Sequence, residues 1–364
     1  MKKLPLILSL ILIISLLAGC AGTPVVYYTD CTCPAAAHTP APTAPVANDT
    51  VDVPTQTDGA WKTGLYINTS VADSAAATSE ADGTASYNVL MAAVLVDDNG
   101  VIQDCIIDGI SASVAFNATG EITSDLTTAP QTKNELGDAY GMRKASSIGA
   151  EWNEQVAAIA KFTVGKTVEE FEKGAISETG KAPEGTDLAS SATMYMSSYV
   201  NAVKMAVANA KPLGAQHGDI LKLATITNLG SSASATAEKA GNAQLDADVV
   251  ALTMNGETIT SCYIDSLQAK VAFDTTGAIT SAVSAPVATK NELGSAYNMV
   301  LHGKAKAEWN EQAASFAAYV TGKTADEVAN ISITEENKPA DVDLTASVTI
   351  KINGFKDLIA KACK

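Results

Sequence analysis

The chain has 364 residues, 47% of them apolar, and a formal net charge of −16 at pH 7. This length and apolar content suffice for about two domains with hydrophobic cores. The acidic balance excludes the clustered positive charge that nucleic acid binding requires, so no nucleic acid partner is expected.

The N-terminal residues have the pattern of an export signal. Lys2 and Lys3 supply the charged region, and Leu6–Leu17 form an apolar stretch too short to span a bilayer comfortably. The stretch ends in Leu-Ala-Gly-Cys at Cys20, which resembles a bacterial lipobox. This resemblance implies a signal peptide over residues 1–19, cleavage before Cys20 and lipidation of its thiol; a plain secretory signal is the alternative. Losing both lysines takes the net charge from −16 to −18.

Residues 20–60 are predicted to form an extended, disordered tether. Six of the chain's twelve prolines lie in it, among Ala and Thr, and such a composition cannot bury enough apolar surface to fold. When extended, the tether reaches on the order of 100 Å. Its Cys31 and Cys33 are either a redox pair or plain linker thiols, because the spacing matches no strong motif.

The rest of the chain consists of two copies of an internal sequence repeat. Four short runs recur 157 residues later, which is too long a period for a solenoid unit and indicates a repeated domain. The runs are Val114–Phe116, Thr132–Gly137, Glu151–Gln155 and Gly165–Thr167, with copies at Val271–Phe273, Thr289–Gly294, Glu308–Gln312 and Gly322–Thr324. We therefore expect two tandem homologous domains over residues 61–213 and 214–364.

Each copy begins with β signals. Strands are predicted at Val89–Val96 and Val101–Ile107 around Asn99-Gly100, and Asn-Gly is a strong hairpin signal. The second copy has the same pattern around Asn255-Gly256. A third short strand is expected at Ser113–Phe116 and again at Lys270–Phe273.

Helical periodicity follows the strands. Trp152, Val156 and Ile159 share one helix face, as do their second-copy counterparts Trp309, Ala313 and Phe316. Capping boxes that begin at Thr167 and Thr324 predict a further helix in each copy, and a closing amphipathic helix follows. Strands followed by helices predict the α+β class, with each domain an antiparallel sheet covered by packed helices.

The remaining cysteines and the histidines suggest no metal site. Cys105 and Cys262 occupy equivalent strand positions and are predicted to be buried thiols, whereas Cys363 lies beside the C-terminus. The three histidines are scattered and have no Cys or His partners at useful spacing.

One motif carries a candidate chemistry. Asp187-Leu-Ala-Ser190-Ser-Ala192-Thr193 resembles the flavinylation motif of the FMN-binding-domain family, approximately Asp-x-x-Ser-Gly-Ala-Thr, with Ser191 in place of the glycine. The second copy keeps Asp343 and Thr349 but departs at the three residues before the threonine. Alternation predicts that both threonines lie on the non-core face of a strand. The alternative is that they are ordinary β-branched residues on an exposed strand.

The resemblance implies a covalent cofactor. A dedicated transferase would esterify FMN through its phosphate onto Thr193 and Thr349, giving up to two flavins per chain, and Asp187 would orient the hydroxyl or bind a metal used by the transferase. Tyr140 and Tyr297 are candidates to stack on the ring. Two further pairs have alternatives: Trp152 and Trp309 stack on the ring or lie in the core, and Lys133 and Lys290 face the flavin or are solvated.

The layout of signal, tether and two copies resembles the doubly flavinylated surface lipoproteins of Gram-positive bacteria. That resemblance implies an electron carrier on the outer face of the cell membrane, between a quinol-linked membrane donor and extracellular acceptors, with a pheromone peptide from the signal as a weaker possibility. We expect an electron carrier rather than an enzyme that transforms a substrate, because the sequence has no defensible nucleophile–base pair or paired catalytic carboxylates. The alternative function is a flavin-free surface binding or adhesion lipoprotein.

Overall fold

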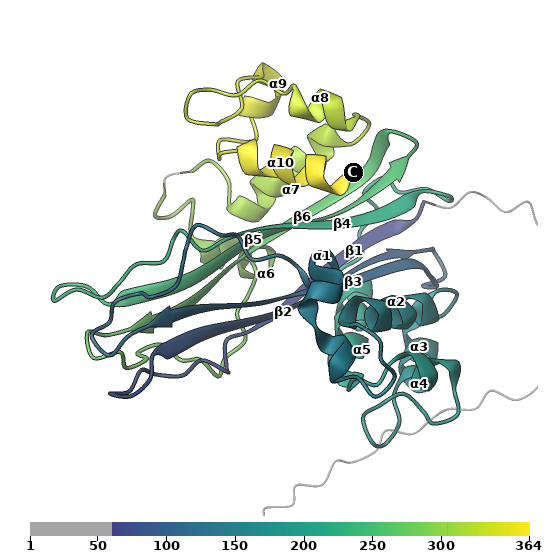
Figure 1. Ribbon diagram of the computed structural model, residues 1–364. Coiled ribbons are helices and arrows are strands. Elements are labelled where there is room, and N and C mark those ends of the chain that lie inside the picture. The colour runs from purple at the N-terminus through teal and green to yellow at the C-terminus, as the bar shows by residue number, and fades with distance from the viewer. Residues whose placement is uncertain (1–59, 304) are drawn as a thin grey trace, which may run out of the picture. The chain divides into compact units, whose positions relative to one another are not determined.

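The computed structural model describes residues 60–303 and 305–364 (Figure 1). The predicted signal peptide, Cys20, the tether, Cys31 and Cys33 lie outside the described residues. Among the helices described, none has both the length and the apolar character needed to cross a bilayer.

The first repeat contributes one three-stranded antiparallel sheet. Its strands are β1 (Lys62–Ser70), β2 (Gly83–Val96) and β3 (Ile102–Phe116), in the spatial order β1-β2-β3. The predicted hairpin joins β2 and β3. Its turn is closed by Asp97, whose carboxylate accepts the N–H groups of Asn99 and Val101, and Gly100 has the left-handed φ of 78° that the turn requires.

The second repeat builds the same kind of sheet from β4 (Ile220–Asn228), β5 (Gly241–Asn255) and β6 (Thr258–Phe273). The predicted separate third strand is wrong in both copies. Each ladder has one register shift near the hairpin turn and then runs on to the pair Gly83↔Phe116 or Gly241↔Phe273, so Ser113–Phe116 and Lys270–Phe273 are the ends of β3 and β6. The third strand of each sheet is instead β1 or β4, which precedes the hairpin.

The helices follow the predicted order. The first repeat has α1 (Lys133–Leu136), α2 (Trp152–Thr163), α3 (Val168–Ala175), α4 (Asp187–Ser191) and α5 (Ser197–Ala208). The second has α6 (Lys290–Leu293), α7 (Trp309–Val320), α8 (Ala325–Ala329), α9 (Val342–Thr345) and α10 (Asn353–Ala362). Short 3-10 turns, Gly137–Tyr140, Met142–Lys144 and Gly294–Tyr297, follow α1 and α6. The expected α+β class, with helices on antiparallel sheets, is confirmed, and the capping boxes at Thr167 and Thr324 are both present.

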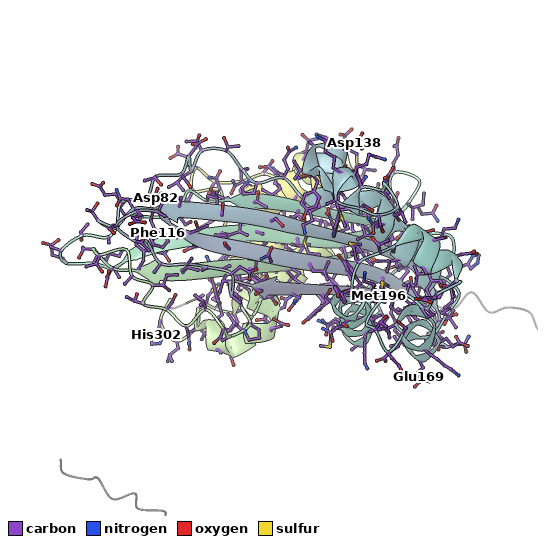
Figure 2. All side chains as sticks on the ribbon, turned by 60° about the horizontal axis from the view of Figure 1, so that its bottom comes forward. Asp82, Phe116, Asp138, Glu169, Met196 and His302 are labelled. Atoms are coloured by element: carbon purple, nitrogen blue, oxygen red, sulfur yellow. The ribbon has the colours of Figure 1, made fainter. Side chains whose placement is uncertain are left out.

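Three hydrophobic cores hold these elements together. Two lie between a sheet and the helices of its own repeat, on either side of the molecule in Figure 1. The third lies between the sheets and draws on both repeats, with the rings of Phe116 and Phe273 stacked at 4.1 Å. Phe116 lies toward one end of the strands, and Met196, beside the helices, toward the other (Figure 2).

Contacts between the repeats are reciprocal. Ala77 donates its N–H to Gly277 at 2.9 Å, and Ala235 donates to Gly120 at 2.7 Å. The two repeats are therefore joined through the apolar faces of their sheets and through matched loop contacts, and the helices of each repeat pack on the other face of its own sheet.

Candidate functional site around Thr193 and Thr349

Thr193 lies in an extended connection between α4 and α5, and the predicted strand at this position is wrong. Asp187–Ser191 is helical because Thr186 caps it, accepting the N–H of Ala189. The residues that follow, 192–196, are not paired with either sheet. We call residues 192–196 the first threonine segment and their counterparts 348–352 the second threonine segment.

Both threonine segments have the same burial pattern, with buried residues at the two ends and half-buried or exposed residues between them. Ala192 and Met196 are buried, whereas Tyr195 is 69% exposed. Thr193 is half-buried, as is Thr349 in the second segment. The threonines are thus away from the deepest core, as alternation predicted, although no β-ladder produces the pattern.

A buried glutamine holds each threonine. Gln155 Oε1 accepts the N–H of Thr193 at 3.0 Å and its hydroxyl at 3.3 Å, and Gln155 is 0% exposed. Gln312 Oε1 does the same for Thr349, at 2.8 and 3.1 Å. Because the hydroxyl hydrogen is directed at the glutamine, the oxygen lone pairs of each threonine are left for another group.

The glutamine is itself fixed in position. In the first repeat, Gln155 Nε2 donates to the hydroxyl of Ser146 and the carbonyl of Ala150, both at 3.1 Å. In the second, Gln312 Nε2 donates to the carbonyl of Ala307 at 2.8 Å. A buried amide with partners on both ends specifies one orientation of the group it holds.

The repeated run Glu-Trp-Asn-Glu-Gln supplies this arrangement. Glu151 accepts the N–H groups of Met142 and Arg143, at 2.8 and 2.9 Å, and so ties the preceding loop to the start of α2. Glu308 makes the equivalent bonds at the start of α7. Sequence reasoning used the run only as a marker of the repeat and missed the glutamine, for which the repetition of all five residues was the available signal.

A lysine lies against two aromatic rings in each repeat. Lys133 Nζ is 4.9 Å from the ring centre of Tyr140 and 5.0 Å from that of Trp152. We call these three residues the first lysine cluster. The second lysine cluster is Lys290 with Tyr297 and Trp309, at 5.3 and 4.8 Å.

Burial distinguishes the tryptophans from the tyrosines of the lysine clusters as candidates to contact a flavin ring. Trp152 and Trp309 are only 3% and 6% exposed, which makes them core residues, while Tyr140 and Tyr297 are half-buried. Both lysines are half-buried too. Among the described residues neither lysine forms an ion pair.

The first lysine cluster adjoins Thr193. Trp152 and Gln155 are three residues apart on α2 and are therefore neighbours on its surface. Trp152 also donates its indole N–H to the hydroxyl of Tyr199 at 3.1 Å, and that hydroxyl donates to the sulfur of Met194, the residue after Thr193. In the second repeat Phe355 takes the place of Tyr199 and packs edge-on against Trp309.

The other motif residues lie apart from the threonine hydroxyls. Asp187 and Asp343 are exposed, and within the part of the chain described no hydrogen bond joins either to its threonine. Ser190 is exposed and donates to the carbonyl of Asp187, while Ala192 is buried. Gln155, and not Asp187, therefore orients the hydroxyl of Thr193.

A buried carboxylate fixes the helix that carries each lysine. Asp108 Oδ1 accepts the N–H of Asn134 in α1, and Asp265 Oδ1 accepts that of Asn291 in α6, both at 3.1 Å. Burial raises the pKa of Asp108, and it raises the pKa of Asp265 to about 6.

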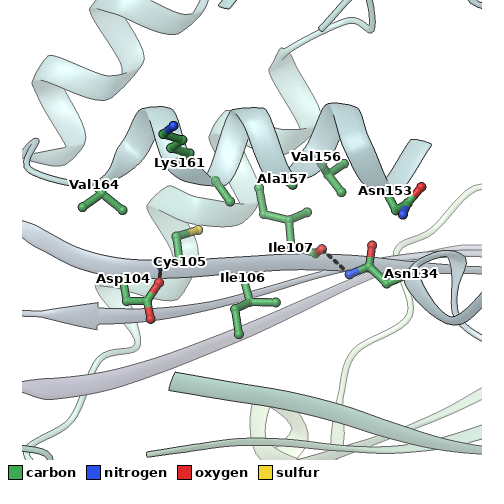
Figure 3. Close-up of a pocket in the computed structure, with 11 residues that line it drawn as sticks. Asp104, Cys105, Ile106, Ile107, Asn134, Asn153, Val156, Ala157, Lys161 and Val164 are labelled. Carbon is green, nitrogen blue, oxygen red and sulfur yellow. Dashed lines mark hydrogen bonds between the residues drawn. The ribbon is translucent and has the colours of Figure 1, made fainter. Parts of the chain in front are cut away.

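A cavity recurs at the same place in both repeats, away from the threonines. The first, about 490 Å³, lies between β3 and α2 (Figure 3). The second, about 470 Å³, lies between β6 and α7. Ala157 lines the first at roughly 160° around α2 from Gln155, given about 100° per residue, so this cavity opens on the far side of the helix from Thr193.

The cavities have thiols in their walls but no reactive cysteine. Cys105 and Cys262 are buried and free, and burial raises the pKa of Cys105 to about 12. A thiol that stays protonated is a poor nucleophile. In residues 60–303 and 305–364 no group of three or more side chains is arranged to hold a metal ion.

Comparison with known proteins identifies no relative: no family model, no curated protein and no solved structure matches this chain.

Proposed function

We propose that the protein is a lipid-anchored extracytoplasmic flavoprotein that carries covalent FMN on Thr193 and Thr349 of two homologous domains, residues 61–213 and 214–364. The observation that carries this proposal is the glutamine-held threonine, which recurs in both repeats. Ordinary exposed threonines do not need a buried amide to direct their hydroxyl.

The surroundings of each threonine fit FMN. The half-buried hydroxyl is oriented but open to another group, as an acceptor of phosphoryl transfer must be. Its oxygen would form the ester bond to phosphorus and release its proton, while the bond from phosphorus to the leaving group of an activated FMN donor breaks. Tyr140 and Lys133, or Tyr297 and Lys290, offer an aromatic face and a positive charge to the flavin ring.

The bound flavin would supply the redox chemistry, and the protein its position and environment. In this role the protein passes electrons from a quinol-linked membrane donor to extracellular acceptors, with the lipid on Cys20 as its anchor. Covalent attachment keeps the cofactor from diffusing away outside the cell.

The second candidate function is a flavin-free binding lipoprotein, which the repeated cavities favour. Asn153 and Asn310 occupy equivalent wall positions, and the side-chain oxygen of each is buried without a hydrogen-bond partner. Such an oxygen is free to accept a hydrogen bond from a ligand.

The two candidates are separated by counting flavins. The full chain is produced in a host that has an FMN transferase, and protein-bound flavin is measured by absorbance after denaturation. We expect two flavins per wild-type chain, one each for Thr193→Ala and Thr349→Ala, and none for the double variant. The matched control, Thr345→Ala, removes a hydroxyl four residues from Thr349 and should keep both. A wild-type chain without bound flavin would exclude the flavoprotein and leave the flavin-free binding lipoprotein as the candidate.

A further inference from the structure

The two lysine clusters have different surroundings. Beneath the second, β5 carries Asp246 and Asp248, which pair across the ladder with Gln268 and Ser266. The equivalent residues of β2, paired with Ser111 and Gly109, are Asn88 and Leu90. The correspondence follows from the matching ladder ends at Gly83 and Gly241.

Asp248 is the larger change, because it replaces an apolar side chain. A methyl group placed on Gly354 would lie 3.6 Å from Asp248 Oδ2, so the carboxylate reaches the start of α10, directly after the second threonine segment. Burial raises the pKa of Asp248, and the positive charge of Lys290 opposes this rise.

Asp246 is linked to the second lysine cluster by hydrogen bonds through the side chain of Gln268. Tyr297 donates its hydroxyl to Gln268 Oε1 at 3.0 Å, and Gln268 Nε2 donates to Asp246 Oδ1 at 3.2 Å. The first repeat has a carboxylate near this position too, since Asp73 accepts from Asn88, but Asp73 is exposed to solvent.

Other charges also differ between the sites, and they are exposed or paired with an opposite charge. The first site has Arg143, which is paired with Asp138 and Glu154 and lies 3.9 Å from the buried Glu151, and it has Glu135 of α1, which is paired with Lys361. The second has the exposed Lys351 and Lys270. Water and salt screen such charges, whereas partly buried charges are screened much less.

We propose that the two sites hold FMN at unequal redox potentials, with the flavin on Thr349 the harder one to reduce. Reduction brings two electrons onto a flavin, with protons taken from water, and nearby carboxylates disfavour the added electron density. At a common potential the Thr193 site then holds the larger share of electrons. This inference rests on the proposed function.

The test compares chains that carry a single flavin. Thr193→Ala leaves the flavin on Thr349, and Thr349→Ala leaves the flavin on Thr193. Each chain is titrated with dithionite at pH 8 against a set of redox mediators, and the oxidised flavin is followed by absorbance. We expect the reduced-to-oxidised ratio on Thr349 to be at least tenfold lower at the same potential, which equals about 30 mV for a two-electron couple.

Carboxylate variants assign the cause. In the Thr193→Ala chain, Asp248→Leu installs the residue of the first repeat and should remove most of the difference. Asp246→Asn, a milder change, should remove part of it, and the exposed Glu335→Gln is the matched control that should leave the potential unchanged.

The outcomes distinguish this inference from the proposed function. Two loaded chains with equal potentials, or a higher potential on Thr349, overturn the inference and leave the proposed function standing. If the Thr193→Ala chain carries no flavin, both the inference and the proposed function are overturned for the Thr349 site. A difference that persists in both Asp248→Leu and Asp246→Asn overturns the assignment to these carboxylates.

Discussion

Replacing Gln155 tests whether the buried glutamine prepares Thr193 for modification. Gln155→Ala removes the only side chain that accepts the N–H and hydroxyl of Thr193 within the described structure, and it leaves Ser146 and Ala150 without their amide donor. Unpaired buried polar groups each destabilise by about 1–3 kcal/mol, and the half-buried Thr193 regains part of this from water. We therefore expect the free energy of unfolding to fall by about 2–4 kcal/mol. A domain of ordinary stability, about 5–15 kcal/mol, remains folded after this loss.

The effect on modification should be larger than the effect on folding. Without Gln155 the hydroxyl samples several directions, and a displacement of about 1 Å can slow a positioned reaction by about 100-fold. The assay incubates the purified chain with an FMN transferase and its flavin donor and follows intact mass with time, while urea titration measures stability. Incorporation at Thr193 should slow by about 100-fold, with incorporation at Thr349 unchanged.

Two further variants control this experiment. Gln312→Ala should reverse the pattern, slowing Thr349 and sparing Thr193, so that each chain contains its own reference site. Gln155→Met fills the space with only a weak acceptor in place of the amide oxygen and should also slow incorporation at Thr193, which separates the effect of the hydrogen bonds from that of a cavity. A folded Gln155→Ala chain that takes up FMN on Thr193 at the wild-type rate would show that Gln155 does not prepare this threonine for modification.

Three further predictions concern the fold. Because burial raises the pKa of Asp265 from 3.8 to about 6, the folded chain binds the extra proton between these values, so the free energy of unfolding should fall by about 2 kcal/mol as pH rises from 4 to 6. Denaturant titrations across this range should show a shallower fall for Asp265→Asn, and an unchanged slope would contradict the assignment. Gly64→Ala would place a methyl group against the carbonyl oxygen of Ala206 in α5 and should lower Tm. Gly354→Ala is the control, because its methyl group would make only an ordinary contact of 3.6 Å, and it should raise the free energy of unfolding by up to about 1 kcal/mol. Equal changes in Tm for the two variants would argue against the close approach of β1 and α5. Phe116→Ala should destabilise by about 3–5 kcal/mol and keep a single unfolding transition followed by both repeats, because its ring stacks on Phe273; two separate transitions would refute a shared core.

Short sequence patterns correctly predicted the helices and hairpin turns that depend only on residues close together in the chain. The spacing of Trp152, Val156 and Ile159 identified α2, and the capping boxes identified the starts of α3 and α8, because helix faces and caps depend on neighbours three or four residues away. The Asn-Gly hairpins were predicted for the same reason. The lengths of β3 and β6 were not, since only pairing with β2 and β5 shows that each ladder is continuous.

The site was predicted in part. Thr193 and Thr349 were singled out from a motif, but alternation over five residues does not distinguish a strand from an extended connection, and neither segment pairs with a strand of the described sheets. Gln155 meets Thr193 across 38 residues of sequence, and the amine of Lys133 lies against the rings of Tyr140 and Trp152. Contacts of this range, and the core that the two sheets share, depend on tertiary packing that one sequence does not reveal.

The central claim is that each repeat carries covalent FMN on its glutamine-held threonine. Peptide mass spectrometry of the chain isolated from the membranes of a host with an FMN transferase tests it most directly. We expect the peptides containing Thr193 and Thr349 both to carry the added mass of esterified FMN, with fragment ions that place it on those two residues. Unmodified peptides at both positions, from a host whose transferase modifies another protein in the same cells, would contradict it.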